Sequence, residues 1–357
     1  MNENRFLKYY KEVKEKLNKK LEEYNNGLKV ETNNLLKENI DVFTNLNSDG
    51  KLIRGTLVNL GYKLKCENTE YSYPLSLAFE IFQTAILVHD DIIDNDDLRR
   101  GKTTIHSYNY NKYKELTNDL NSKKIGESIA ICMGDLGLYE ANQMIAKNYK
   151  DDSKLGDVLI YFNDIVLKTI KGEIIDVTLP FLEKNNLLTD NLEENIMLIY
   201  KLKTAYYTII GPLSLGLILA GTNKEELQEI ENIGLKIGTA FQIQDDLLGI
   251  YSDNNKLGKN VGSDIEEFKQ TLLYSYTKNN KEYYDKLIKL YGKKVTNQEL
   301  EEVKQIFKDS GAYLYATGMV DKLYSEALEL IENLNWIKEE DKEILKYFVI
   351  YLKTREK

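Results

Sequence analysis

The chain has 357 residues, of which 42% are hydrophobic and 29% charged, so it is long enough for one large domain or two modest ones. Its net charge of -9 at pH 7 argues against non-specific nucleic-acid binding, which depends on a broad basic surface, and no nucleic-acid partner is expected. Only three prolines are present, and this scarcity favours long uninterrupted helices.

Apolar residues recur at spacings of three and four along almost the whole chain, which indicates amphipathic helices. The predicted breaks are rich in Gly, Asn, Asp and Pro, and they lie at 47–50, 99–104, Pro180, 221–223 and 252–262. Segment 107–123 has no clear period, and we expect a loop or short helices there. With no Pro- or Ser-rich linker and no fixed-period repeat, the sequence predicts one all-α domain over residues 1–357. The predicted helices lie near 2–25, 30–44, 52–66, 72–95, 124–148, 153–179, 192–221, 224–251, 263–278, 281–291, 297–333 and 338–355.

The location of the protein is indicated by three features. The N-terminal stretch MNENRFLKYYKEVKEKLNKK is charged from its start and lacks the apolar region of a secretory signal. No uncharged apolar run reaches about 18 residues, so we expect no transmembrane segment. Cys66 and Cys132 match no disulfide or metal-binding spacing, which favours a reducing compartment. The sequence therefore predicts a cytoplasmic protein.

The stretch HDDIIDNDDLRRG (89–101) directly follows the apolar run AFEIFQTAILV (78–88). On a helix, Asp90 and Asp94 stand on one face about 6 Å apart along the axis, with Asp91 beside them. Like charges about 4 Å apart repel by about 4 kcal/mol at an effective dielectric constant near 20. We therefore expect a hard cation or the adjacent arginines, Arg99 and Arg100, to lie against this cluster.

A second apolar helix ends in the same way, within FQIQDDLLGIYSDNNKLGKNVGSD (241–264). Asp245 and Asp246 stand near a helix C-terminus, whose partial negative charge makes them unfavourable unless a cation binds. Mg²⁺ typically takes one or two carboxylates and completes its shell with water and phosphate. One such aspartate pair is usually a solvated helix end, but two pairs with basic neighbours predict a polynuclear Mg²⁺ site for a phosphorylated substrate.

The motifs together resemble those of the trans-isoprenyl diphosphate synthases, which make farnesyl, geranylgeranyl and longer polyprenyl diphosphates. The first motif of that family, DDxxD followed by RRG, is matched at 90–101. The resemblance implies that Asp90, Asp91 and Asp94 bind Mg²⁺ on the allylic diphosphate. It also implies that Arg99 contacts that diphosphate, and that Arg100 contacts isopentenyl diphosphate.

Further motifs follow in the family's order. GKxxR at 50–54 is similar to the isopentenyl diphosphate site and supplies Lys51 and Arg54, with Gln83 on the same ligand. KTA at 203–205 is similar to the family's Lys-Thr pair, at which a helix kinks. GEIID at 172–176 is similar to GQxxD, with Glu173 in place of glutamine. Two last motifs supply Gln242, Asp245, Asp246, Lys259 and Asp264.

The resemblance implies an isoprenoid-synthase helical bundle with a central cavity, acting as a homodimer with two to three Mg²⁺ ions. The implied reaction condenses isopentenyl diphosphate with an allylic diphosphate, and the released diphosphate takes the proton. The residues implied in catalysis are Asp90, Asp91, Asp94, Arg99, Lys203, Thr204, Gln242 and Lys259. Those implied in substrate binding are Lys51, Arg54, Gln83, Arg99, Arg100, Lys203 and Lys259. The implied metal ligands are Asp90, Asp91, Asp94, Asp245 and Asp246.

Product length is expected to depend on Phe82, Ala85 and Ile86, which precede Asp90 on its helix. Ala85 lies about 7.5 Å from Asp90 along the axis. Family members that stop at farnesyl length often place an aromatic residue there. An alanine predicts an open path and a product of C20 (geranylgeranyl) or longer.

Two positions depart from the family's pattern, and two alternative functions stay open. Gly249 stands where a third aspartate of the second motif is common, and Leu52 stands where many bacterial members have a basic residue. A class I terpene synthase shares the helical architecture, but it needs no isopentenyl site and carries a different second motif. A subunit of a heteromeric synthase would often lose an aspartate motif, whereas both are present here.

Overall fold

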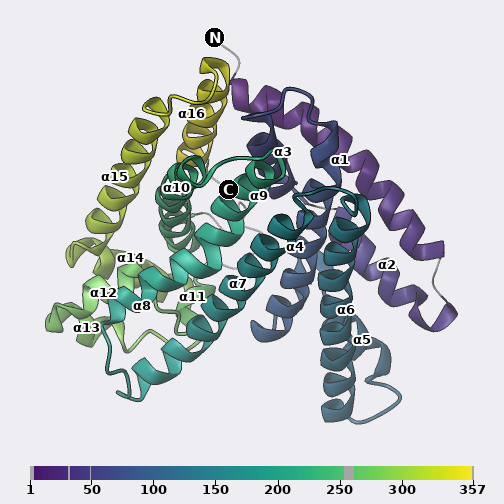
Figure 1. Ribbon diagram of the computed structural model, residues 1–357. Helices are drawn as coiled ribbons and strands as arrows, with labels where there is room; N and C mark the ends of the chain where they lie inside the picture. The colour runs from purple at the N-terminus through teal and green to yellow at the C-terminus, as the bar shows by residue number, and fades with distance from the viewer. Residues whose placement is uncertain (1–3, 31–32, 49, 253–260, 356–357) are drawn as a thin grey trace. The chain divides into compact units, whose positions relative to one another are not determined.

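The computed structural model describes residues 4–30, 33–48, 50–252 and 261–355, and the chain divides into two compact units (Figure 1). We call residues 8–160 and 215–222 the α4 unit. The remainder, residues 1–7, 161–214 and 223–357, is called the α10 unit. The prediction of a single domain over 1–357 stays a prediction.

The α4 unit is helical apart from one short hairpin, β1 (Leu98–Arg99) paired with β2 (Lys102–Thr103). Its central helix α4 begins with a proline in the first turn, where a missing N–H costs nothing, and it packs on α6, α3 and α2. The helices are α1 (Arg5–Val30), α2 (Asn34–Ser48), α3 (Ile53–Lys63), the 3₁₀ turn η1 (Glu70–Ser72), α4 (Tyr73–Ile93), α5 (Ile105–Tyr113), α6 (Asp119–Asn148) and the start of α7 (Leu155–Lys184).

Close packing of α4 on α6 depends on glycines of α6. A Cβ added at Gly137 would lie 2.9 Å from the Ala85 Cβ and 2.9 Å from Cζ of Phe43. A Cβ added at Gly134 would lie 2.2 Å from His89 Nε2. The helices therefore approach more closely than any side chain at these two positions would allow. This contact fixes the end of α4, where the first acidic motif stands.

The α10 unit is built around α10 (Lys224–Tyr251), which packs on η2 and α15. Asn223 caps α10 in a reciprocal arrangement with Glu226, which satisfies two backbone N–H groups at the helix start. The other elements are the rest of α7, α8 (Leu192–Ile199), the π-helix η2 (Tyr200–Ile210), the first four residues of α9 (Gly211–Leu219), α11 (Ser263–Glu266), α12 (Leu272–Lys278), α13 (Lys281–Leu287), α14 (Asn297–Asp309), α15 (Ala312–Glu332) and α16 (Glu339–Thr354).

The all-α prediction is confirmed, but several predicted boundaries were wrong. Pro180 does not end α7, which continues to Lys184. The predicted helix 297–333 is divided at Gly311, which has a φ of +83° that a continuing helix does not allow. The predicted helix 263–278 is divided into α11 and α12. Segment 107–123, where a loop or short helices were expected, contains most of the short helix α5 and the start of the long helix α6.

One helical run is long and apolar enough to cross a membrane by length and composition alone. It covers Leu192–Leu219, and 78% of its most apolar window is buried inside the protein. The sequence-based expectation overlooked this run, although residues 204–223 carry no charged side chain. Such burial is that of a core helix in a soluble protein.

Candidate active site

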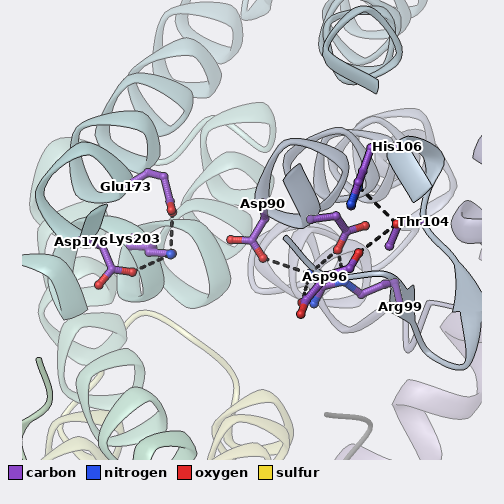
Figure 2. Close-up of polar contacts among 9 residues, drawn as sticks. Asp90, Asp96, Arg99, Thr104, His106, Glu173, Asp176 and Lys203 are labelled. Atoms are coloured by element: carbon purple, nitrogen blue, oxygen red, sulfur yellow. Dashed lines mark hydrogen bonds and ion pairs between the residues drawn. The ribbon is translucent and has the colours of Figure 1, made fainter. Parts of the chain in front are cut away.

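Two carboxylates of the first acidic motif, those of Asp90 and Asp91, contact the guanidinium of Arg99 (Figure 2). Arg99 Nε donates to Asp91 Oδ1 at 2.6 Å, and Arg99 Nη2 donates to Asp90 Oδ2 at 3.1 Å and to Asp96 Oδ2 at 3.3 Å. Arg99 lies in β1, so the hairpin after α4 carries the arginine back to the helix end. We expected either a hard cation or an adjacent arginine beside these aspartates, and Arg99 is the partner seen in the structure.

The three carboxylates of the motif differ in exposure. Asp91 is 1% exposed, whereas Asp90 and Asp94 are half-buried. Burial raises the pKa of Asp91 to about 7, although Arg99 opposes that shift. The Oδ2 atom of Asp91 is buried without a hydrogen-bond partner. Asp90 and Asp94 are thus the more accessible carboxylates of this motif.

Arg100, next to Arg99, has a contact in another part of the α4 unit. Its backbone is left-handed, with a φ of 54°, and its Nη1 donates to the Leu46 carbonyl at 3.4 Å. The exposed fraction of its side chain is large. The adjacent arginines Arg99 and Arg100 therefore have different surroundings, and their assignment to two different diphosphates stays a prediction.

The start of α3 holds Arg54, and a buried acid that sequence reasoning missed lies against it. Glu80, on α4, is 3% exposed and accepts from the Gly55 backbone N–H at 2.6 Å. Burial raises the pKa of Glu80, and Arg54 and Arg100 oppose that shift through their charges. Lys51 is exposed and Gln83 is half-buried. The structure thus brings Arg54 and Arg100 under the influence of one carboxylate.

In the α10 unit, Lys203 is held between two carboxylates of α7 (Figure 2). Its Nζ lies 2.6 Å from Glu173 Oε2 and 2.7 Å from Asp176 Oδ2. Lys203 and Lys269 together hold the pKa of Asp176 below its usual value, against the effect of burial. Glu173, at the position where the family has glutamine, therefore places a negative charge directly beside the Lys203 ammonium.

A chain of hydrogen bonds connects Thr204, the residue after Lys203, to the second acidic motif. Thr204 Oγ1 donates to Gln242 Oε1 at 2.5 Å, and Gln242 Nε2 donates to Asp246 Oδ1 at 2.8 Å. Asp246 also accepts from the hydroxyl of Tyr200, a residue that the motifs did not single out. Burial raises the pKa of Asp246 to about 7, with a further contribution from Asp264. A small cavity of about 40 Å³ adjoins these groups.

Asp245 differs from Asp246 in its partner. Its Oδ1 forms an ion pair with Arg355, whose guanidinium lies 3.9 Å from the centroid of the Phe241 ring. The Asp245 side chain is 39% exposed. Lys259, predicted to bind the allylic diphosphate, lies outside the described residues.

Comparison with known proteins decides the family. The sequence pattern of the family described as Polyprenyl synthetase matches residues 34–310. The short chain isoprenyl diphosphate synthase of Methanocaldococcus jannaschii is 32% identical over 74% of each chain. The chain belongs to the polyprenyl synthetase family. The geranylgeranyl diphosphate synthase of Sulfolobus acidocaldarius is 27% identical over 99% of each chain.

The helical-bundle fold of this family is confirmed by a solved structure. A geranylgeranyl pyrophosphate synthase from Corynebacterium glutamicum, complexed with isoprenyl diphosphate and magnesium, superposes with a TM-score of 0.85. The match covers 98% of this chain and 99% of that one, at 24% identity. The predicted enzyme class, a prenyl diphosphate synthase, is confirmed by the family.

Two departures from the family's pattern have physical explanations. A Cβ added at Gly249 would lie 3.0 Å from Asp264 Oδ2, so the Asp264 carboxylate takes up the space of a third aspartate side chain. Leu52 is 2% exposed and has a left-handed backbone with a φ of 55° at the start of α3. Its side chain is part of the core, where a basic residue would be costly.

The donor set fits a magnesium site that the substrate completes. Among the described residues, no group of three or more His, Cys, Asp or Glu side chains is arranged to hold a metal ion. Mg²⁺ needs only one or two protein carboxylates when phosphate oxygens fill the shell. The half-buried Asp90 and Asp94, one helical turn apart, provide such oxygens within the α4 unit, and Asp245 provides one in the α10 unit.

The three residues predicted to set product length differ in burial. Phe82 and Ala85 are 0% exposed, and Ala85 faces Gly137 of α6. Ile86 is half-buried, as are Gln83 and Asp90 at helical spacing from it. The assignment of these residues to a tail site stays a prediction, as does the central cavity.

Proposed function

We propose that this protein condenses isopentenyl diphosphate with an allylic diphosphate, with Mg²⁺, and releases geranylgeranyl diphosphate or a longer polyprenyl diphosphate. The observation that carries the proposal is the Arg99 contact with Asp90 and Asp91 at the end of α4. It occurs in a chain that matches the family over residues 34–310. Relatives named for short-chain and geranylgeranyl products support the same reaction.

The allylic diphosphate must be bound and its departure as an anion stabilised. We assign that work to Arg99, Lys203 and Lys259 as charge-assisted donors. Two carboxylates hold the Lys203 ammonium in place, so little further ordering is needed when it meets a phosphate. Bound Mg²⁺ would act as a Lewis acid toward the leaving diphosphate. We propose two to three ions, held through Asp90, Asp94 and Asp245. We leave out Asp91 and Asp246, which the resemblance also implies as ligands, because both are buried and hydrogen-bonded to other side chains.

Isopentenyl diphosphate is assigned to Lys51, Arg54 and Arg100, with Gln83 as a further polar contact. Arginine suits a diphosphate because its planar guanidinium donates two parallel hydrogen bonds. The Glu80 carboxylate lies close enough to Arg54 and Arg100 to act on both charges. The proton lost after condensation is assigned to the released diphosphate, since the two histidines of the chain are not required by any motif.

The oligomeric state we propose is a homodimer, and the location is the cytoplasm. An apolar stripe on α7 supports the dimer, because its members are 42% to 63% exposed and recur in a heptad-like pattern. Contiguous apolar surface of this kind usually marks an interface. The stripe consists of Leu167, Ile170, Ile174, Val177 and Phe181.

One assay tests the proposed reaction and its alternatives. Purified protein is incubated with Mg²⁺, isopentenyl diphosphate and each allylic diphosphate, and product lengths are read by mass spectrometry. We expect diphosphates of C20 or longer and no product in excess EDTA. Hydrocarbon or alcohol products without use of isopentenyl diphosphate would identify a terpene synthase. Activity only after addition of a second subunit would identify a member of a heteromeric synthase.

A further inference from the structure

Tyr200 is a buried phenol at the first residue of η2, three residues before Lys203. It is 3% exposed, and its hydroxyl donates to Asp246 Oδ2. The same hydroxyl accepts from the backbone N–H of Leu272 at 3.0 Å. That N–H belongs to the first turn of α12, where no helical carbonyl is available to it. Tyr200 therefore ties together η2, α10 and α12.

The other oxygen of Asp246 holds Gln242. Gln242 Nε2 donates to Asp246 Oδ1 at 2.8 Å, and Gln242 Oε1 accepts from Thr204 Oγ1 at 2.5 Å. A carboxamide has a donor end and an acceptor end, so these two contacts fix which way the Gln242 side chain points. The orientation of Thr204, next to Lys203, thus depends on Asp246 through Gln242.

Asp246 is arranged as an anchor for these donors. It is 4% exposed, and each of its oxygens accepts a hydrogen bond from a neutral side chain. A buried carboxylate that loses a donor pays a desolvation cost, and it turns to another partner where one is available. Removal of the Tyr200 hydroxyl would therefore disturb Gln242 and Thr204 as well.

We propose that Tyr200 is a positioning residue for the condensation. By anchoring Asp246 it sets Gln242 and Thr204 in the arrangement that ionisation of the allylic substrate requires. The inference rests on the proposed function, since the resemblance implies that Thr204 and Gln242 act in catalysis of that same reaction.

Tyr200→Phe tests the inference because it removes one hydroxyl and keeps the ring. Steady-state rates are measured with Mg²⁺, isopentenyl diphosphate and farnesyl diphosphate. We expect kcat to fall by about tenfold or more, as when a catalytic group is displaced by a fraction of an ångström to about 1 Å. The KM for isopentenyl diphosphate should not change. Calorimetry should show weaker binding of an unreactive thiolo analogue of the allylic diphosphate.

Tyr161→Phe is the matched control within the same unit. The Tyr161 hydroxyl also donates to a carboxylate, Glu231 Oε1, at 2.5 Å, but that pair lies outside the hydrogen-bond chain of Asp246. Both variants should lose thermal stability, and only Tyr200→Phe should lose kcat. If Tyr200→Phe loses stability alone, the inference is overturned. An inactive wild-type protein would instead overturn the proposed function.

Asp246→Asn keeps the test decisive if Tyr200→Phe does not fold. This substitution keeps the size of the side chain and should give the same fall in kcat with an unchanged KM for isopentenyl diphosphate. If both variants fold, the double variant should be no slower than the slower single variant, because the residues act as one unit. A normal kcat for Asp246→Asn, or independent multiplying effects, would contradict the inference.

Discussion

Each acidic motif forms an ion pair with an arginine of its own unit, and the two arginines come from different kinds of segment. Arg99 comes from the hairpin that directly follows α4. Arg355 follows α16, and its guanidinium lies between Asp245 and the Phe241 ring. Burial lowers the pKa of Arg355 to about 10, which leaves it charged at neutral pH. Asp245 therefore has an internal cation with which Mg²⁺ would compete if Asp245 is a metal ligand, as we propose.

If Arg355 and Mg²⁺ compete for the Asp245 carboxylate, Arg355→Ala should change the Mg²⁺ concentration that the enzyme needs. Without the guanidinium, the Asp245 carboxylate attracts a divalent ion more strongly, so less Mg²⁺ should be needed for half-maximal activity. The measurement is the initial rate as a function of Mg²⁺ concentration at saturating substrates. Lys353→Ala is the control, because Lys353 pairs with Asp321 and not with the motif. An unchanged or increased Mg²⁺ requirement in Arg355→Ala would contradict this prediction.

Candidate site residues that belong to short sequence motifs could be predicted from the sequence. Residues that reach the site only through tertiary contacts could not. Asp90, Arg99 and Lys203 stand in short patterns whose spacing implies their roles. Glu80 and Tyr200 do not, because an acid or a phenol inside an apolar stretch has the same sequence signature whether it is structural or functional. Their contacts are made with Gly55 and Asp246, which are distant in sequence.

Among the elements, α4 and α6 pack closely where glycines of α6 meet Ala85, one of the residues predicted to set product length. Gly137→Ala should lower the free energy of unfolding by about 1–3 kcal/mol, since its Cβ would lie 2.9 Å from both Ala85 and Phe43. Gly27→Ala, in α1, is the control because nothing lies within 4 Å of its added Cβ. There we expect a gain of about 0.5–1 kcal/mol from helix propensity. Chemical denaturation measures both, and equal effects would mean that α4 and α6 are not in such close contact.

The contact of α5 with α6 predicts a pH dependence of stability. His106 is 7% exposed, and burial lowers its pKa. An unfolded histidine titrates near about pH 6.5, so between the two pKa values only the unfolded chain binds the proton. The free energy of unfolding is thus unaffected by His106 well above about pH 6.5, and it decreases as the pH falls below that value.

The pH dependence is tested with His106→Gln, which removes the titrating group. Unfolding is followed from pH 7.5 to 5 in the wild-type protein and in the variant. The wild-type protein should lose more stability over this range than His106→Gln does. His89→Gln serves for comparison because that ring is half-buried. Parallel curves for wild type and His106→Gln would show that His106 is not responsible.

Helix positions were largely predictable from apolar spacing, and the errors have local causes. Pro180 removes one N–H from α7 only four residues before the helix ends at Lys184. Leu179 and Glu183, on either side of it, are buried, so tertiary packing holds the last turn. The π-helical form of η2 was not predictable, because the same apolar pattern fits an α-helix. Such local widening of a helix is frequent at functional sites.

For the whole molecule, the exposed stripe on α7 supports the proposed homodimer. Phe181 and Val177 are 63% and 53% exposed, and they lie on the stripe that also contains Leu167, Ile170 and Ile174. An apolar helix face of this length is unfavourable in water, and a second copy of the chain with the same face would cover it. Glu173 and Asp176 of the same helix contact Lys203. Charged substitutions at Val177 and Phe181 therefore change the stripe and leave those two carboxylates in place.

Sedimentation velocity should show a dimer for the wild-type protein and a monomer for the double variant Val177→Lys, Phe181→Lys. Two ammonium groups per chain on the stripe would face their symmetry mates across an apolar contact, where their desolvation is costly. Ile350→Lys is the matched control, because Ile350 is an exposed isoleucine (41%) on α16 of the same unit and lies outside the stripe. That variant should stay dimeric. A wild-type monomer, or a double variant that sediments as a dimer, would show that the α7 stripe does not join two copies of the chain.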